Sequence, residues 1–276
     1  VVDINRTPIS AIDPPRTAIE LGPGWTFRLL DTPHQLPADC TAPDYDDTGW
    51  TAIDVPCSWQ LTPAGERDIP IYTNVQYPWP AELPTIPDAN PTGVYRLRFD
   101  HATAAPAPEV EWLVTFGGVD SAFDLWCNGE WIGASTDSRL DATFDLSAVL
   151  VEGENVLVAR VMRWSAGSYL EGQDQWWLSG IHRSVRLWSR QRTHLRDIDI
   201  RTPLDRSAVN GSLRVRARVS GPLDGHQVRV RCATPTQTDL LDQRIDIEDH
   251  IASLNHQMGP VRRWFAEDPY LHRVTV

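Results

Sequence analysis

The sequence predicts an all-β protein made of two β-sandwiches, and three observations predict it. First, 22 Pro and 17 Gly residues divide the 276-residue chain into short segments. Second, several of these segments alternate apolar and polar residues, which is the period of two that a half-buried strand requires. Third, no stretch keeps apolar residues at helical spacing for long enough to predict a helix, although residues 44–50 have room for one turn.

The clearest strands lie in the middle of the chain. In residues 94–99 (VYRLRF), aromatic and aliphatic side chains alternate with two arginines, so one face of this strand is expected in the core and the other in solvent. Residues 112–116 (WLVTF) form a continuous apolar run before two glycines, which predicts a strand buried on both faces. Between FDLWC and EWIG, Asn128-Gly129 predicts a type I′ hairpin turn, because both residue types tolerate positive φ.

A change in composition divides the chain into two domains. Residues 1–80 contain Pro at short intervals, which predicts long loops wrapped over a sandwich. Trp is frequent up to Trp188 and then absent until Trp264, while the later residues contain clean alternations such as SLRVRARV and QVRVRC. Residues 1–192 are therefore expected to form a jelly-roll β-sandwich, and residues 193–276, about 85 residues, a smaller immunoglobulin-like β-sandwich.

Charge and composition exclude several functions. The formal net charge is −12 and all 25 basic residues are Arg, which disfavours nucleic-acid binding because that function needs a basic face. No apolar run approaches the ~20 residues of a membrane span, and the first residues contain no export signal. The four Cys residues are scattered, without a CxxC pair or a nearby His. Reduced thiols in a cytoplasmic protein are therefore expected, and a metal site made of His and Cys is not.

Three segments carry specific motifs. They are IPIYTNVQYPWP (residues 69–80), CNGEWIGASTDSRLDATFDLS (residues 127–147) and RWSAGSYLEGQDQWWLSGIHRSVRL (residues 163–187). In this order they resemble the amino-terminal part of bacterial β-galactosidases of glycoside hydrolase family 2. WFAEDPYLHRV, near the end of the sequence, resembles the strand that closes the immunoglobulin-like domain of this family, with His272 where the family usually has Tyr.

The resemblance implies that a catalytic domain is missing from this chain. In the family a jelly-roll domain, a sandwich domain and a (β/α)8 barrel follow one another, and both catalytic glutamates lie in the barrel. Such a barrel needs about 250 residues, whereas only about 85 strand-like residues follow the expected jelly roll. The catalytic barrel is therefore expected to be absent, and the strand-like end suggests that the chain is a piece of a longer one.

The function implied by the resemblance is that of a non-catalytic amino-terminal fragment of a retaining β-galactosidase. The parent enzyme would hydrolyse terminal β-galactosides with two carboxyl groups about 5 Å apart, and we nominate no such pair in this chain. The fragment would supply scaffold, part of the galactose pocket and contacts in a homo-oligomer. Two alternatives stay open at this point, a stand-alone carbohydrate-binding module and a structural interaction domain.

The resemblance also implies two contacts with a galactosyl unit. Asn74 and Val75 lie in the loop by which the first domain of the family reaches over the barrel mouth. An amide suits this position because, like a sugar hydroxyl, it both donates and accepts hydrogen bonds. Asp174 matches the family aspartate that approaches the galactose 6-hydroxyl together with a bound sodium ion. That ion site would be incomplete here, so the fragment is expected to bind no cofactor, whereas sodium and magnesium are expected in the parent enzyme.

Both site residues have structural alternatives. Asn74 would otherwise pin a Pro-rich loop, which is a common role of loop Asn residues. Asp174 would otherwise pair with Arg163 or Arg183 in a charged loop. Arg139 is expected to be a solvated or ion-paired loop residue.

The sequence departs from the family pattern at two positions. Gly172 stands where the family commonly has an acidic residue, and Trp177 where a basic side chain often lies.

Aromatic faces can stack on a pyranose, which draws attention to Trp79, Trp164, Trp176 and Trp177. Of these, Trp79 and Trp177 are expected to be exposed. The tryptophans inside strand-like runs are expected in the core, namely Trp112, Trp126 and Trp188.

Overall fold

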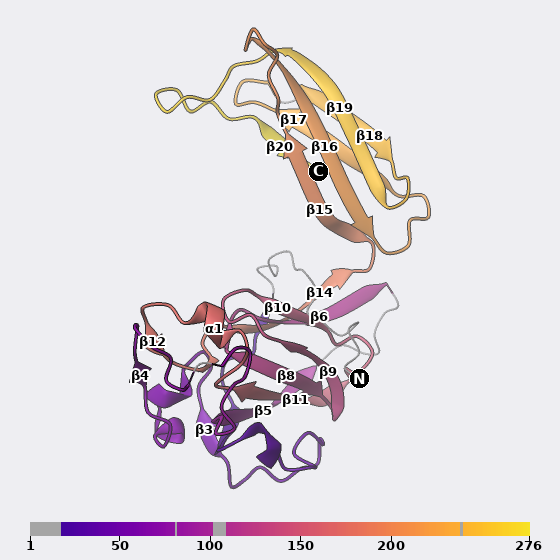
Figure 1. Cartoon of the computed structure of the whole chain (residues 1–276). Coiled ribbons are helices and arrows are strands. Elements are labelled where there is room, and N and C mark those ends of the chain that lie inside the picture. Colours follow the sequence, from indigo (N-terminus) through magenta and orange to yellow (C-terminus); the bar gives the residue numbers. More distant parts are fainter. Residues whose placement is uncertain (1–17, 81, 102–108, 238–239) are drawn as a thin grey trace. The chain divides into compact units, whose positions relative to one another are not determined.

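The computed structural model describes residues 18–80, 82–101, 109–237 and 240–276 (Figure 1). The chain forms two compact units, one ending at Arg190 and the other spanning Gln191–Val276. Each unit is built from β-sheets, so the all-β prediction of a larger sandwich followed by a smaller one is confirmed. Within the described ranges, no helix is long and apolar enough to cross a membrane.

The first unit contains two large sheets. The six-stranded sheet has the order β3-β2-β5-β11-β8-β9, formed by Thr51–Ile53, Trp25–Leu30, Thr92–His101, Gly153–Met162, Ala122–Cys127 and Glu130–Ser135. The four-stranded sheet has the order β1-β14-β6-β10, formed by Ile19–Glu20, Val185–Gln191, Val110–Phe116 and Ala142–Asp145. Between residues 18 and 65, three short 3₁₀ helices lie in the loops, namely η1 (Pro33–Gln35), η2 (Trp59–Leu61) and η3 (Pro63–Gly65).

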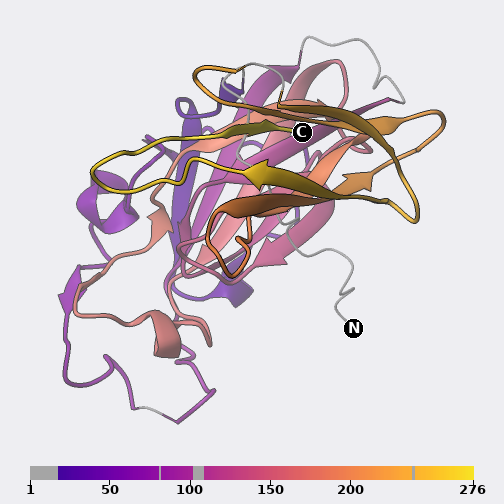
Figure 2. The same ribbon diagram turned by 90° about the horizontal axis from the view of Figure 1, so that it is seen from above.

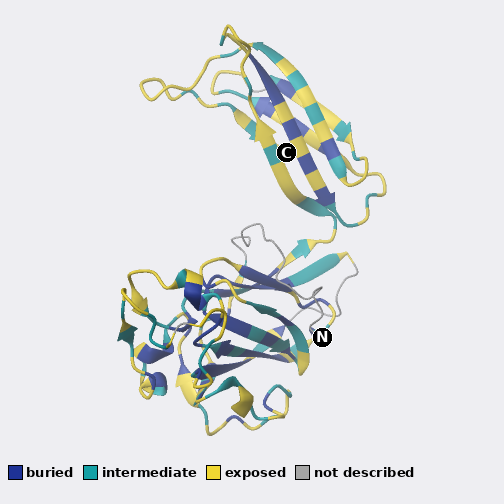
Figure 3. Ribbon diagram, in the orientation of Figure 1, coloured by how far each residue is buried: buried dark blue, intermediate teal, exposed yellow. Residues whose placement is uncertain are grey.

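The main core lies between these two sheets (Figure 3). Tyr95 and Leu97 of β5 are buried in it, as the alternation in residues 94–99 predicts. Residues 113–116 of β6 are all buried, which confirms a strand covered on both faces. Asn128 and Gly129 have φ angles of 51° and 86°, which confirms the predicted hairpin turn between β8 and β9.

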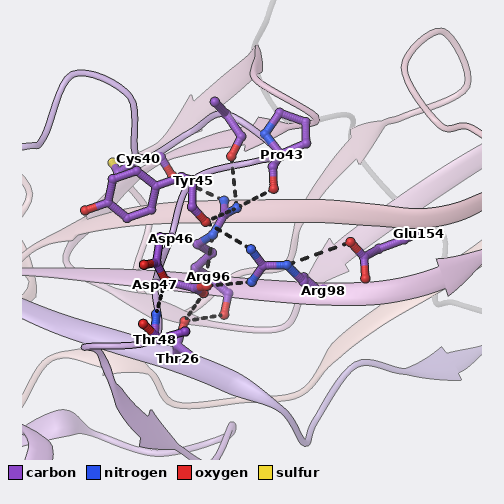
Figure 4. Close-up of polar contacts among 11 residues, drawn as sticks. Thr26, Cys40, Pro43, Tyr45, Asp46, Asp47, Thr48, Arg96, Arg98 and Glu154 are labelled. Atoms are coloured by element: carbon purple, nitrogen blue, oxygen red, sulfur yellow. Dashed lines mark hydrogen bonds and ion pairs between the residues drawn. The ribbon is translucent and has the colours of Figure 1, made fainter.

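On the other face of β5, Arg98 is exposed as predicted, whereas a loop covers Arg96, so the prediction was wrong at that position. Arg96 is fully buried, and its guanidinium donates to two carbonyl oxygens of the loop 40–47, each at 2.9 Å (Figure 4). Arg96 also lies 3.3 Å from the carboxylate of Asp47. That carboxylate is 2.6 Å from Arg98 and accepts a 2.8 Å hydrogen bond from the Thr26 hydroxyl. The two arginines of β5 therefore hold this loop against the sheet through its carbonyl oxygens and the Asp47 carboxylate.

The three tryptophans expected in the core divide into two groups. Trp188 is buried and donates its indole N–H to the Thr115 hydroxyl at 2.9 Å. Trp112 and Trp126 are only half-buried and pack at the edges of apolar clusters. The expectation of burial in the core is therefore met by Trp188, whereas it was wrong for Trp112 and Trp126, whose rings stay partly exposed.

Short elements gather at one edge of the first sandwich. The ribbon of β4 (Ile71–Tyr72) and β12 (Trp176–Trp177) and the ribbon of β7 (Val119–Asp120) and β13 (Gly180–Ile181) lie outside the two large sheets. The only α-helix among the described residues, α1 (Ser168–Glu171), lies nearby. The segments around β4 and around α1 and β12 run side by side in both views (Figures 1 and 2). Residues 44–50 form turns rather than a helical turn.

The second unit is a smaller sandwich of two three-stranded sheets. One has the order β15-β16-β19, formed by His194–Arg201, Asn210–Ser220 and Ile251–Pro260. The other has the order β18-β17-β20, formed by Leu241–Asp246, Gln227–Ala233 and Arg273–Thr275. From Leu213 to Val219 of β16 every second residue is buried (Figure 3), and these residues meet the buried residues of β17 in a separate core.

Candidate functional site

The β4–β12 ribbon joins the two loops that the sequence singles out. Tyr72 pairs with Trp176 and Ile71 with Trp177, although about a hundred residues separate them in the sequence. The indole N–H of Trp177 also donates to the carbonyl oxygen of Thr73 at 3.3 Å. The loop that contains Asn74 and Val75 and the loop that contains Asp174 are therefore neighbours.

Asp174 is exposed, and its partner is a tyrosine. The Tyr72 hydroxyl donates to Asp174 Oδ1 at 2.5 Å, and this hydrogen bond to the carboxylate raises the pKa of Tyr72. Among the described residues, neither Arg163 nor Arg183 forms an ion pair with Asp174. Arg163 pairs with Asp68, and Arg183 donates to backbone carbonyl oxygens. The charged-loop alternative for Asp174 therefore finds no support in the structure.

Asn74 and Val75 lie at the tip of their loop. Both are exposed, Val75 to 90%. The turn is held by the Thr73 hydroxyl, which donates to the carbonyl oxygen of Gln76 at 2.7 Å. Within the part of the chain that the structure describes, the Asn74 amide makes no hydrogen bond. Both its donor and its acceptor groups can therefore meet a ligand.

Five aromatic side chains form a base under the two loops, namely Tyr77, Trp79, Trp164, Tyr169 and Trp177. Trp79 packs 4.6 Å from Trp164 between ring centroids, and Trp177 packs 5.5 Å from Trp164. The expectation that Trp79 and Trp177 are exposed was wrong, because both are half-buried in this base. Trp176 lies outside this base and is exposed, because it is adjacent to Trp177 in β12 and adjacent residues of a strand point to opposite faces.

A buried ion pair fixes both loops at their beginnings. The Arg163 guanidinium donates to Asp68 Oδ1, while Asp68 Oδ2 accepts hydrogen bonds from the indole of Trp59 at 2.7 Å and the amide of Gln60 at 2.9 Å. Arg163 also donates to the carbonyl oxygen of Ile69 at 3.2 Å. Sequence reasoning missed Asp68, because nothing in its neighbourhood along the chain distinguishes it from an exposed loop carboxylate.

Two carboxylates share a small pocket next to α1. Asp120 and Glu171, the last residue of α1, line a pocket of about 10 Å³, which is room for one water molecule. Glu171 accepts hydrogen bonds from the backbone N–H of Ser138, at 2.9 Å, and from its hydroxyl. Asp120 lies 3.2 Å from Arg139, which is therefore ion-paired. Burial raises the pKa of Asp120 to about 7 despite this arginine.

Asp174 is the candidate metal ligand that the sequence singles out at this edge. No group of three His, Cys, Asp or Glu side chains that could hold a metal ion occurs among them. Asp174 offers one hard oxygen, Oδ2, that accepts no hydrogen bond in the described part of the chain. A sodium ion there would need its other ligands from a substrate, from water or from outside these residues.

Comparison with known proteins points to one family. A model of the glycosyl hydrolases family 2 sugar binding domain matches residues 19–191. The β-galactosidases of Vibrio cholerae and Psychromonas ingrahamii are each 42% identical to the chain, over 267 and 264 residues that cover 91% of it. The chain spans only about a quarter of the length of these curated relatives, 25% in both cases.

Solved structures share the fold. A β-glucuronidase from an uncultured Clostridium species superposes with a TM-score of 0.64 at 17% identity, covering 96% of this chain and 44% of that one. The β-glucuronidase of Bifidobacterium dentium gives a TM-score of 0.64 at 19% identity, covering 96% of this chain and 45% of that one. The family model matches more than half of the chain, and the aligned segment contains Asn74, Val75 and Asp174. The chain therefore belongs to glycosyl hydrolase family 2.

Proposed function

We propose that this chain is the non-catalytic amino-terminal part of a retaining β-galactosidase, and that it supplies Asn74, Val75 and Asp174 to the galactose pocket of the complete protein. The observation that carries the proposal is the β4–β12 ribbon, which places an unpartnered amide and an exposed carboxylate on neighbouring loops. The β-galactosidase names of relatives 42% identical to the chain support this substrate class.

The chemistry of the two side chains fits recognition of a sugar. The Asn74 amide can donate to one hydroxyl and accept from another. Asp174 would bind a hydroxyl or a sodium ion through Oδ2, while Tyr72 holds Oδ1 and so fixes the orientation of the carboxylate. The buried pair of Asp68 and Arg163 keeps the loops in place without a ligand, so that binding orders few side chains.

Cleavage of the glycosidic bond needs two carboxyl groups in a defined geometry. The two carboxyl groups that share a pocket here, Asp120 and Glu171, already have structural partners in Arg139 and Ser138. The catalytic pair would therefore come from a barrel domain that follows this chain in the complete protein. The isolated chain is expected to leave an aryl β-galactoside intact.

The proposal is tested in the complete protein that contains this chain. Asn74→Ala and Asp174→Ala should each lower kcat/KM for a galactoside by roughly tenfold or more, because each removes a contact in a partly desolvated site. Sodium dependence should change only in the Asp174 variant. Gln76→Ala and Asp88→Ala are matched controls, since both side chains are exposed and make no hydrogen bond or ion pair within the described residues.

The outcomes separate the candidate functions. Unchanged kinetics in both site variants would contradict a role in the galactose pocket. Tight galactose binding by the isolated 276-residue chain would instead favour a carbohydrate-binding module that works alone, because one wall of a pocket offers few simultaneous contacts.

A further inference from the structure

Asp120 belongs to a cluster of polar side chains at one edge of the first sandwich. Arg139 lies 3.2 Å from the Asp120 carboxylate through one terminal nitrogen and 3.2 Å from Nε2 of His182 through the other. The same Nε2 lies 2.9 Å from the carbonyl oxygen of Ser138, whose backbone N–H and hydroxyl donate to Glu171. Among the residues that the structure describes, Arg139 alone forms an ion pair with Asp120, and it shares its guanidinium with His182.

The other charged groups near Asp120 leave its carboxyl poorly compensated. Arg163 pairs with a different carboxylate, and Arg183 donates to backbone carbonyl oxygens. Burial raises the pKa of Asp120 to about 7, and the negative charge of Glu171 raises it further, whereas Arg139 and Arg163 lower it. The Asp120 carboxyl therefore changes its charge near neutral pH.

The segment 172–179, which contains Asp174, lies against the same cluster. Every residue of this segment except Asp174 lines the small pocket that Asp120 and Glu171 also line. Both ends of the segment are attached to the cluster, because Glu171 precedes it and Gly180, which follows it, is paired with Asp120 in the β7–β13 ribbon. Asp174 therefore lies in a loop whose two ends depend on the groups around Asp120.

Ionisation of Asp120 opposes the packing of this segment. A neutral carboxyl is buried at modest cost, whereas a carboxylate needs water or several hydrogen-bond donors. Within the described residues Oδ1 of Asp120 accepts no hydrogen bond, and the pocket of about 10 Å³ has room for a single water molecule. Displacement of the segment 172–179 would admit more water to the carboxyl group. Opening of the segment is therefore coupled to release of a proton.

We propose that Asp120 is a proton-dependent positioning residue for the segment 172–179. Its neutral carboxyl keeps the segment packed over the pocket, and its ionisation favours a displaced segment. The consequence for sugar binding rests on the proposed function, because Asp174 would contact galactose only while the segment is packed. Galactoside binding is then regulated by pH through a group that does not touch the sugar.

Hydrogen exchange of backbone amides in the complete protein tests the role of Asp120. The protection factors of residues 172–179, corrected for the intrinsic pH dependence of amide exchange, should fall by up to about tenfold per pH unit between pH 5 and pH 7. They should level off above about pH 8, where Asp120 is ionised in both forms. In Asp120→Asn, whose side chain stays uncharged, they should not vary with pH. Asp88→Asn is the matched control, because this exposed carboxylate has no partner within the described residues, and it should keep the parent profile.

Two further readouts separate positioning from a general effect on stability. Glu171→Gln keeps an acceptor for Ser138 but removes a neighbouring negative charge, so the profile should move to lower pH, which also covers the case that Asp120→Asn does not fold. The amides of β11 in the core should not follow the profile of the segment. A pH dependence that persists in Asp120→Asn would assign the titration to another group such as His182 and overturn the proposal. An equal pH dependence in β11 would also overturn it, because the whole domain would then open.

A separate measurement isolates the proposed function. Isopropyl β-thiogalactoside at ten times its dissociation constant should raise the protection of residues 172–179 about tenfold if Asp174 contacts the sugar only in the packed form. Unchanged protection would contradict the galactose contact of Asp174 and leave the proton-dependent packing in place. Protection by the galactoside without any pH dependence would overturn the role of Asp120 alone.

Discussion

Gly172 makes room for the ring of Trp177. A Cβ atom at position 172 would overlap Cη2 of the indole and lie 2.9 Å from Cζ2. The φ angle of Gly172 is −68°, which any residue can adopt, so the glycine is required for space alone. The two departures from the family pattern are therefore coupled, because the bulky ring at 177 is compatible with no side chain at 172.

This coupling predicts a non-additive pair of variants. Gly172→Ala should destabilise the chain by about 1–3 kcal/mol, because the added methyl group displaces the indole. In a Trp177→Leu background the same change should cost much less, which urea unfolding of the four proteins would measure as a coupling free energy. Gly49→Ala is the control, since a Cβ there meets no atom within 4 Å. Equal costs in both backgrounds would contradict the coupling.

The buried pair of Arg96 and Asp47 should dominate the stability of the loop 40–47. Asp47→Ala leaves the fully buried guanidinium without its counter-ion and should cost about 3–5 kcal/mol in urea unfolding. Glu154→Ala removes an exposed carboxylate 3.8 Å from Arg98 and should cost less than about 1 kcal/mol. If the two variants were equally stable, the loop would not depend on the buried pair.

Asp120 should make stability depend on pH. Burial raises the pKa of Asp120 to about 7 in the folded chain, whereas an unfolded Asp titrates near its ordinary value of 3.8. The folded state therefore binds more protons between these values, and the contribution of Asp120 to stability, present below about pH 4, is lost as the pH rises through 7. Asp120→Asn should remove this part of the pH dependence of the melting temperature. An identical profile in the variant and the parent chain would refute the assignment.

The hydrogen bond between Tyr72 and Asp174 should be visible in the titration of the phenol. Asp174→Asn removes the negative charge that holds the proton on Tyr72, so the pKa of Tyr72 should fall towards its ordinary value. Chains labelled with ¹³C at tyrosine Cζ report this by NMR, and Tyr72→Phe identifies the resonance. Asp88→Asn should leave it unchanged. An unaltered Tyr72 titration in the Asp174 variant would show that the two groups do not interact in solution.

Local patterns predicted the strands because a strand repeats every two residues. The alternation in residues 94–99 identified the core residues Tyr95 and Leu97, and Asn128-Gly129 identified a turn. The same alternation misplaced Arg96 in solvent. Its burial depends on carbonyl oxygens of a loop about fifty residues earlier, which no local pattern contains.

The sequence motifs nominated residues for the candidate site but did not reveal which side chains contact them. Asn74 and Asp174 were nominated in this way, whereas the phenol that binds Asp174 comes from the other loop. The exposed tryptophan was misassigned to Trp177 because the sequence does not show which face of the short β12 strand turns outward. Asp68 and Asp120 were missed because their burial is created by segments far away in the sequence.

The β4–β12 ribbon also determines how late during folding the candidate site can form. Tyr72 and Asp174 are separated by 102 positions, and strands β5 to β11 lie between them in the chain. Closing so long a loop is entropically unfavourable until β5, β6, β8 and β11 have already paired. The site should therefore be among the last regions to gain protection from hydrogen exchange during refolding. During synthesis on the ribosome, the loop of Asn74 can pack beside the loop of Asp174 only after the second half of the domain has emerged.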